Sequence, residues 1–156
     1  MTYQDLMEAI AARIAKLWPD RMLYRDFCPA DHKRPSGFLY VTNADYEDAN
    51  LFLVRWTFEA ELTLYAATDA YSAESTEQLR ADQLAVLGAF GGPAIQVGDR
   101  SVILNVGAPS PGPGEAYVTF SASWMDGRPA CTDPDVPPSD VPLMEYYKLN
   151  ISTKTC

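Results

Sequence analysis

The sequence predicts an α+β fold: a mixed, mainly antiparallel β-sheet with one very long strand acting as a hairpin arm, and two amphipathic helices packed on one face. Three observations support this fold class. Residues 51–66 alternate between apolar and polar side chains, which is typical of a half-buried strand. Residues 2–17 and 75–88 carry apolar side chains at helical spacing. Several shorter apolar runs lie between turn residues, as neighbouring strands do.

The longest alternating segment runs from Leu51 to Ala66. Its apolar face consists of Phe52, Val54, Trp56, Phe58, Ala60, Leu62, Leu64 and Ala66. At about 3.3 Å per residue the segment would reach roughly 50 Å, whereas a typical strand has about 5–6 residues. A compact domain of this size does not need such a strand for its own core. We therefore expect it to project past the core in a hairpin, or to line an assembly surface.

The first helix is expected over residues 2–17. Thr2 can serve as its N-cap, and Asp5 follows at the position that completes a capping box. One apolar stripe is formed by Leu6, Ile10, Ile14 and Leu17. The segment Trp18–Pro19–Asp20 ends the helix, because a residue before proline avoids the helical region.

The second helix is expected over residues 75–88, with Ser75 and Gln78 as its capping-box pair. Its apolar side consists of Leu79, Leu84, Val86, Leu87 and Phe90. Glycine at position 88, or the pair at 91–92, is expected to stop it. Both helices can then cover the same face of the sheet.

The remaining strands are shorter, and residues 43–50 are interpreted as an acidic connection between two of them. Strands are expected at 22–27, 37–42, 94–97, 101–106 and 115–124, with a last short one at 143–151. Gly98–Asp99–Arg100 is a hairpin turn signal. Within 115–124, the side chains of Val118, Phe120, Ala122 and Trp124 are expected to face the core.

The chain divides into a single α+β domain at residues 1–128 and a proline-rich C-terminal arm at residues 129–156. Five of the twelve prolines lie between Pro129 and Pro142. Proline lacks the backbone N–H, so this stretch can be neither a continuous helix nor a central strand. We expect it to pack along the domain or along a neighbouring subunit.

The net charge of −9 and the pI of about 4.4 argue against a surface that grips nucleic-acid phosphates or an anionic membrane. The three cysteines match no disulfide framework or zinc motif. No apolar run approaches the roughly 20 residues of a membrane span, and the N-terminus has no signal-peptide pattern. We therefore expect a protein of a reducing cytoplasm with no membrane partner.

Residues for common catalytic chemistry are scarce. The single histidine, His32, lies near Cys28, Asp26 and Asp31, and we interpret it as a solvated loop residue. The Gly/Pro loop at 107–114 lacks the backbone N–H groups that a phosphate cradle needs. We expect no enzymatic activity, no cofactor and no metal.

The candidate functional surface is instead a polar one. Arg55, Thr57, Glu59, Glu61 and Thr63 alternate with the apolar residues of the long strand. Asp45, Glu47 and Asp48 precede it in the acidic connection. We interpret these eight residues as a candidate assembly interface, or as the lining of a lumen in a ring.

Three short motifs resemble the tail terminator (tail completion) proteins of tailed bacteriophages, in the prophage type common in Gram-positive hosts. They are Leu17–Pro19 with Met22–Tyr24, then Arg34–Leu39, and finally Pro142–Glu145 with Leu149–Ile151. The order of the elements is also similar from end to end. The loop at 107–114 and the proline-rich stretch at 129–142 depart from the family's pattern.

The resemblance implies a structural virion protein rather than an enzyme. Such proteins form a six-fold ring on the head-proximal end of the tail tube, where they join the tube to the head connector. The implied partners are other copies of the chain in a homo-hexamer, the tail tube protein and the head–tail connector protein. DNA would pass through the lumen without specific binding, and the protein would belong to the virion after assembly in the host cytoplasm.

Two alternatives remain open. The chain also resembles other phage neck or head–tail connector proteins, because one sequence does not separate them from terminators. A small α+β ligand-binding or enzymatic domain would instead need a deep apolar pocket with convergent polar groups between sheet and helices, near Cys28 and His32.

Overall fold

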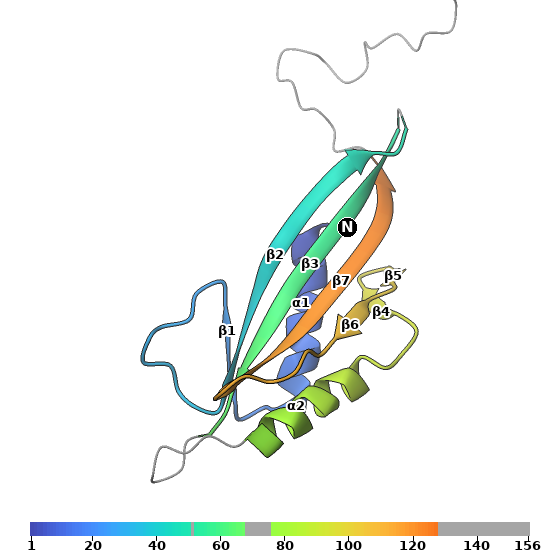
Figure 1. The fold of residues 1–156 in the computed structure, drawn as a ribbon. Helices are drawn as coiled ribbons and strands as arrows, with labels where there is room; N and C mark the ends of the chain where they lie inside the picture. The colour runs from blue at the N-terminus through green and yellow to red at the C-terminus, as the bar shows by residue number, and fades with distance from the viewer. Residues whose placement is uncertain (51, 68–75, 128–156) are drawn as a thin grey trace, which may run out of the picture.

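The computed structural model describes residues 1–50, 52–67 and 76–127 (Figure 1). Within them the chain forms two α-helices, α1 (Tyr3–Leu17) and α2 (Thr76–Ala89). The strands are β1 (Met22–Arg25), β2 (Ser36–Asp48), β3 (Leu53–Tyr65), β4 (Ile95–Val97), β5 (Arg100–Val102), β6 (Asn105–Gly107) and β7 (Glu115–Gly127). The proline-rich segment 129–156, with the strand predicted at 143–151, lies outside the described residues.

Five strands form one sheet in the order β1-β2-β3-β7-β6. Only β1 and β2 run parallel, and every other neighbouring pair is antiparallel. Strands β4 and β5 pair separately around the predicted turn, where Gly98 adopts a positive φ of 60° that glycine tolerates without strain. The predicted α+β fold with a mixed, mainly antiparallel sheet is therefore confirmed.

The prediction of one very long strand is not confirmed. Strand β3 has 13 residues rather than the 16 expected, and β2 and β7 have the same length. Each spans roughly 43 Å at about 3.3 Å per residue. Figure 1 shows the three strands running together past the N-terminal end of α1. The projecting part is thus a three-stranded arm, for which we use residues 44–48, 53–57 and 123–127, rather than one arm of a simple hairpin.

Strand β2 extends well beyond the predicted segment 37–42. The residues expected to form an acidic connection belong to the strand as far as Asp48, each paired with β3. The pairing register shifts between Val41 and Asn43, as at a β-bulge. The bulge breaks the alternation in the sequence, and acidic residues have low strand propensity, so the extension has no clear sequence pattern.

Helix α1 agrees with the prediction in its position and in its cap. The Thr2 side chain accepts a hydrogen bond from the Asp5 N–H, and the Asp5 carboxylate accepts one from the Thr2 N–H. The second of these hydrogen bonds holds the pKa of Asp5 below its usual value. The predicted stripe is buried at Leu6, Ile10 and Ile14.

Helix α2 buries a different face from the one predicted. Leu79 and Val86 are buried, but Leu84 is 67% exposed. Asp82 and Gln83 occupy buried positions instead. Both are satisfied by partners distant in sequence, which the local apolar pattern does not reveal. Ser75, the predicted cap, lies outside the described residues.

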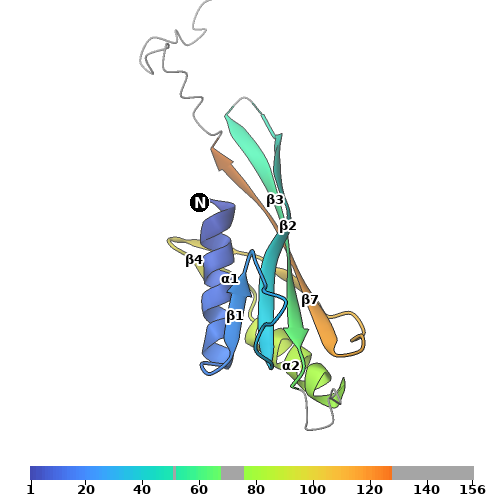
Figure 2. The same ribbon diagram turned by 90° about the vertical axis from the view of Figure 1, so that its left-hand side faces the viewer.

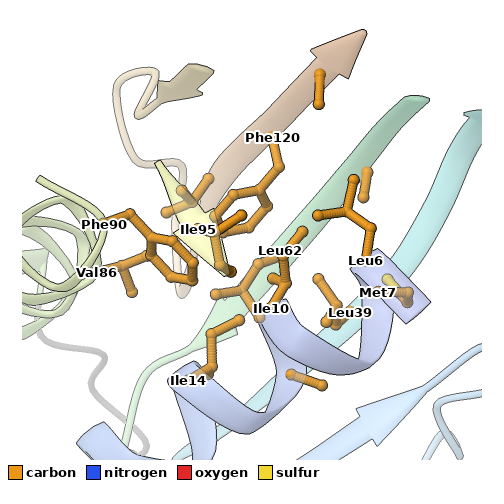
Figure 3. Close-up of a cluster of buried hydrophobic side chains, with 14 of the residues drawn as sticks. Leu6, Met7, Ile10, Ile14, Leu39, Leu62, Val86, Phe90, Ile95 and Phe120 are labelled. Carbon is orange, nitrogen blue, oxygen red and sulfur yellow. The ribbon is translucent and has the colours of Figure 1, made fainter. Parts of the chain in front are cut away.

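The core lies between one face of the sheet and the two helices. Figure 2 shows α1 on one side of the long strands, with the other side left uncovered by a helix. Figure 3 shows the buried side chains of both helices, the sheet and β4 meeting in one cluster, among them Ile10, Leu62, Val86 and Phe120. The predicted inward residues Val118, Phe120 and Ala122 are buried, and Trp124 packs at the edge of the cluster.

Candidate functional site

The face of the sheet opposite the helices, called the outer face below, contains most of the predicted site residues. In β3 the even-numbered residues Phe58, Ala60, Leu62 and Leu64 are buried against the helices. Successive strand side chains point to opposite sides, so the odd-numbered residues from Arg55 to Thr63 belong to the outer face.

Residues directly opposite in register share a face. Asp45 is paired with Thr57, and Glu47 with Arg55, which adds both carboxylates to the outer face. Asp48 is paired with the fully buried Val54 and belongs to the helix side of the sheet. Seven of the eight predicted site residues therefore come together on one surface, and Asp48 does not.

The outer face is acidic, and its side chains become less exposed from Glu59 toward Thr63. Its three long strands carry the carboxylates of Asp45, Glu47, Glu59, Glu61 and Glu115 and a single cationic side chain, Arg55. Arg55 donates to Glu47 at 3.2 Å, but both side chains are more than half exposed, so this ion pair adds little stability. Glu59 is exposed, Glu61 is partly buried and Thr63 is buried, so accessibility falls away from the arm.

Two tyrosines hold two of these carboxylates in place. The Tyr40 hydroxyl donates to Glu61 at 2.5 Å, and the Tyr117 hydroxyl donates to Glu115 at 2.5 Å. Each hydrogen bond favours the protonated phenol, which raises the pKa of Tyr40 and that of Tyr117 to about 12. The ring of Tyr40 also stacks on Phe38, with centroids 4.8 Å apart. These carboxylates are thus fixed in position rather than freely mobile.

The end of the outer face away from the arm is covered by the β1–β2 loop. The His32 ring lies 4.1 Å from the Tyr65 ring and 6.4 Å from the Tyr24 ring, measured between centroids. The interpretation of His32 as a solvated residue is therefore wrong, because its ring packs on the aromatic side chains of two strands. Burial, followed by the Cys28 thiol, raises the pKa of Tyr65.

The helix side of the arm carries a row of aromatic rings that the sequence analysis did not single out as a site. Tyr46, Trp56 and Trp124 are directly opposite one another on β2, β3 and β7. The two indoles are nearly parallel, with centroids 6.0 Å apart, and Tyr46 lies 5.0 Å from Trp56. The row could be found only from the strand pairing, because Tyr46 lies in the segment predicted as a connection.

An ion-pair cluster joins the outer part of the arm to the helix layer. The Asp126 carboxylate binds the Met1 α-ammonium at 3.1 Å and the Arg100 guanidinium at 3.2 Å. Burial alone would raise the pKa of Asp126, but the hydrogen bonds from Met1 and from the Gly127 N–H, together with Arg100, lower it overall. The strand β7 is thereby linked both to the start of α1 and to β5.

Three hollows on the described surface differ in size and in lining. An apolar one between α1, β1 and β2, lined by Trp18, Leu23 and Leu64 among others, holds about 10 Å³, room for roughly one water. Two open depressions flank α1: one of about 420 Å³ lies between α1 and the strands β1 and β2, and one of about 600 Å³ lies between α1 and the β4–β5 hairpin. Neither Cys28 nor His32 lines any of the three.

In the described part of the chain no three His, Cys, Asp or Glu side chains are grouped as metal ligands would be. Among the same residues, neither helix has the length and apolar character needed to cross a membrane.

Comparison with known proteins gives little further information. The chain matches no protein family and no curated protein. One solved structure without a descriptive name is similar at 16% identity, over 82% of this chain and 96% of the other, with a TM-score of 0.38. A similarity this weak carries no argument about function.

Proposed function

We propose that this chain is a structural virion protein of the tail terminator type, which assembles into a ring that caps the tail tube and meets the head connector. The observation that supports it best is the outer face: three 13-residue strands carry a polar, acidic surface that neither helix covers. A broad, open surface of this kind suits contact with other protein subunits or the lining of a channel better than it suits enclosure of a small molecule.

The geometry of the arm fits such an assembly. An arm that extends past α1 can reach a neighbouring subunit, and a heterologous contact repeated around an axis closes into a ring. Exposed carboxylates at Asp45 and Glu59 would repel DNA phosphates if this part of the face lined the lumen. DNA could then pass without binding. The residues of the ring contact and the lumen are proposed to lie among Asp45, Glu47, Arg55, Thr57 and Glu59, the accessible part of the outer face.

The decisive measurement is the native mass of the purified chain by light scattering over a wide range of concentration. A hexamer, with a ring visible in electron micrographs, is the expected result. A closed two-fold dimer would contradict the proposal. If the chain is monomeric alone, mixing with purified tail tubes must produce a capped tube end, and the absence of binding to tubes would contradict the proposal as well.

A further inference from the structure

We propose that the aromatic row Tyr46–Trp56–Trp124 is the docking site for the proline-rich segment 129–142 of the same chain. This inference does not rest on the proposed ring. It rests on the chemistry of the row and on the point where the described chain leaves β7.

The row is a continuous aromatic surface, in which Tyr46 is tilted by 50° to Trp56 and the two indoles are nearly parallel, and it has one unmet polar group. Tyr46 is 50% exposed, and Trp56 and Trp124 are partly buried. The indole nitrogen Nε1 of Trp124 is buried, and it has no hydrogen-bond acceptor within the described residues. A buried N–H without an acceptor is destabilising, so an occupant that brings a carbonyl oxygen is favoured over a purely apolar one.

Proline-rich segments have the matching chemistry. In the polyproline II conformation their carbonyls make no internal hydrogen bonds, and their pyrrolidine rings pack on flat aromatic side chains. Residues 129–142 contain five prolines, at Pro129, Pro134, Pro137, Pro138 and Pro142. A segment of this kind could supply both the apolar contact and the acceptor for Trp124 Nε1.

The position and length of the segment favour docking within one chain. Strand β7 ends at Gly127, three residues after Trp124, and residues 128–156 continue from there. The row crosses three strands, which is about 10 Å at the usual strand spacing. Fourteen residues in polyproline II conformation span roughly 43 Å, enough to turn back and cover the row. The short tether also gives a high effective concentration.

Photo-crosslinking of the full-length chain tests the proposal. A benzophenone amino acid placed at Trp56 should form crosslinks to residues 129–142, identified by mass spectrometry after proteolysis. The same probe at Thr57, the next residue but on the outer face, is the matched control and should not reach them. A mixture of isotopically heavy and light chains should give only heavy–heavy and light–light products. Mixed products would assign the site to a second copy, and crosslinks confined to other regions would exclude the segment; either result overturns the proposal.

Because the benzophenone probe at Trp56 replaces one ring of the row, a second test leaves all three aromatic residues in place. Pro137→Ala with Pro138→Ala in the full-length chain should speed hydrogen exchange at the Trp124 indole N–H and shift tryptophan emission to longer wavelength. Pro113→Ala, at an exposed position in another loop, should leave both unchanged. Unaltered exchange in the double variant would refute docking of this segment on the row.

Discussion

The Tyr40 hydroxyl on β2 donates a hydrogen bond of 2.5 Å to the Glu61 carboxylate on the neighbouring strand β3. The two residues are directly opposite in the antiparallel register. Their contact crosses the strand pair near the middle of the outer face, between the exposed arm and the end covered by the β1–β2 loop. Tyr117 and Glu115 repeat the chemistry within β7. Tyrosine hydroxyls therefore hold two carboxylates of the outer face by hydrogen bonds. These hydrogen bonds are lost when the tyrosines ionise at high pH, so the stability of the fold should depend on pH there.

The first prediction concerns that pH dependence. The pKa of Tyr40 and of Tyr117 rises from 10.0 to about 12 in the folded protein. Below about pH 10 both phenols are protonated whether or not the chain is folded, and the stabilisation is fully present. Between about pH 10 and 12 the unfolded chain loses these protons first, so the free energy of unfolding falls. Tyr40→Phe with Tyr117→Phe should lower stability at pH 7 by about 1 kcal/mol per hydrogen bond and should remove the part of this alkaline loss that these two tyrosines cause.

Urea unfolding at several pH values measures the free energy, and near-ultraviolet absorbance follows tyrosinate formation. Two tyrosines that titrate near pH 12 should disappear from the absorbance curve of the double variant. Glu61→Gln is the matched control, because it retains an acceptor for Tyr40 but removes the charge; it should lower the pKa of Tyr40 toward its usual value. An alkaline loss of stability identical in the wild type and the double variant would count against the assignment.

The second prediction concerns the core beneath the outer face. Phe58 is fully buried, and Phe58→Ala should destabilise the protein by about 3–5 kcal/mol through lost burial and a residual cavity. Glu59→Gln, one position along on the exposed side, should change stability by less than about 0.5 kcal/mol. Thermal or urea unfolding compares the two. Similar effects at both positions would mean that Phe58 and Glu59 do not lie on opposite faces of the sheet, as described for β3.

The third prediction concerns the polar contact between the layers at α2. Arg21 donates to Asp82 at 2.6 Å, with the Asp82 side chain 9% exposed. Asp82→Ala should cost about 2–3 kcal/mol, because it leaves the Arg21 guanidinium partly buried without its partner. Arg21→Met combined with Asp82→Leu should recover much of that loss, since the unpaired charge is gone. A double-mutant cycle in urea gives the coupling, and additive single effects would show that the pair is not coupled.

The sequence identified those features whose pattern is local. The capping box of Thr2 and Asp5, the buried stripe at Leu6 and the alternation of β3 each follow from spacing within a few residues. The continuation of β2 to Asp48 is different, because its acidic residues form a strand only through pairing with β3 and the bulge near Val41 hides the period. Local reasoning interpreted it as a connection.

Buried polar residues were missed for a related reason. The Gln83 amide donates to the carbonyl oxygens of Pro109 and Tyr117, both at 2.8 Å. Those partners lie more than 25 residues away in the chain, so no spacing rule pairs them. The same holds for the candidate site: the sequence identified all eight polar residues, but only the register shows that Asp45 and Glu47 share a face with the polar residues of β3 and that Asp48 does not.

The last prediction tests the accessible part of the outer face as an assembly surface. Arg55→Glu, or Asp45→Lys with Glu59→Lys, should disrupt ring formation or tube capping while the monomer stays folded. These side chains are exposed, and the ion pair of Arg55 with Glu47 is too exposed to support the fold, so the loss of stability should stay within about 1 kcal/mol. Glu61 is avoided because its replacement would also release Tyr40.

Native mass and capping of purified tail tubes measure assembly, and circular dichroism with thermal unfolding checks the fold. Glu8→Lys, at an exposed position on α1, reverses the same charge on the helix side of the molecule and serves as the control. It should assemble as the wild type does. If the outer-face variants also assemble normally, this surface is not the contact between subunits. If Glu8→Lys fails equally, net charge rather than the outer face controls assembly.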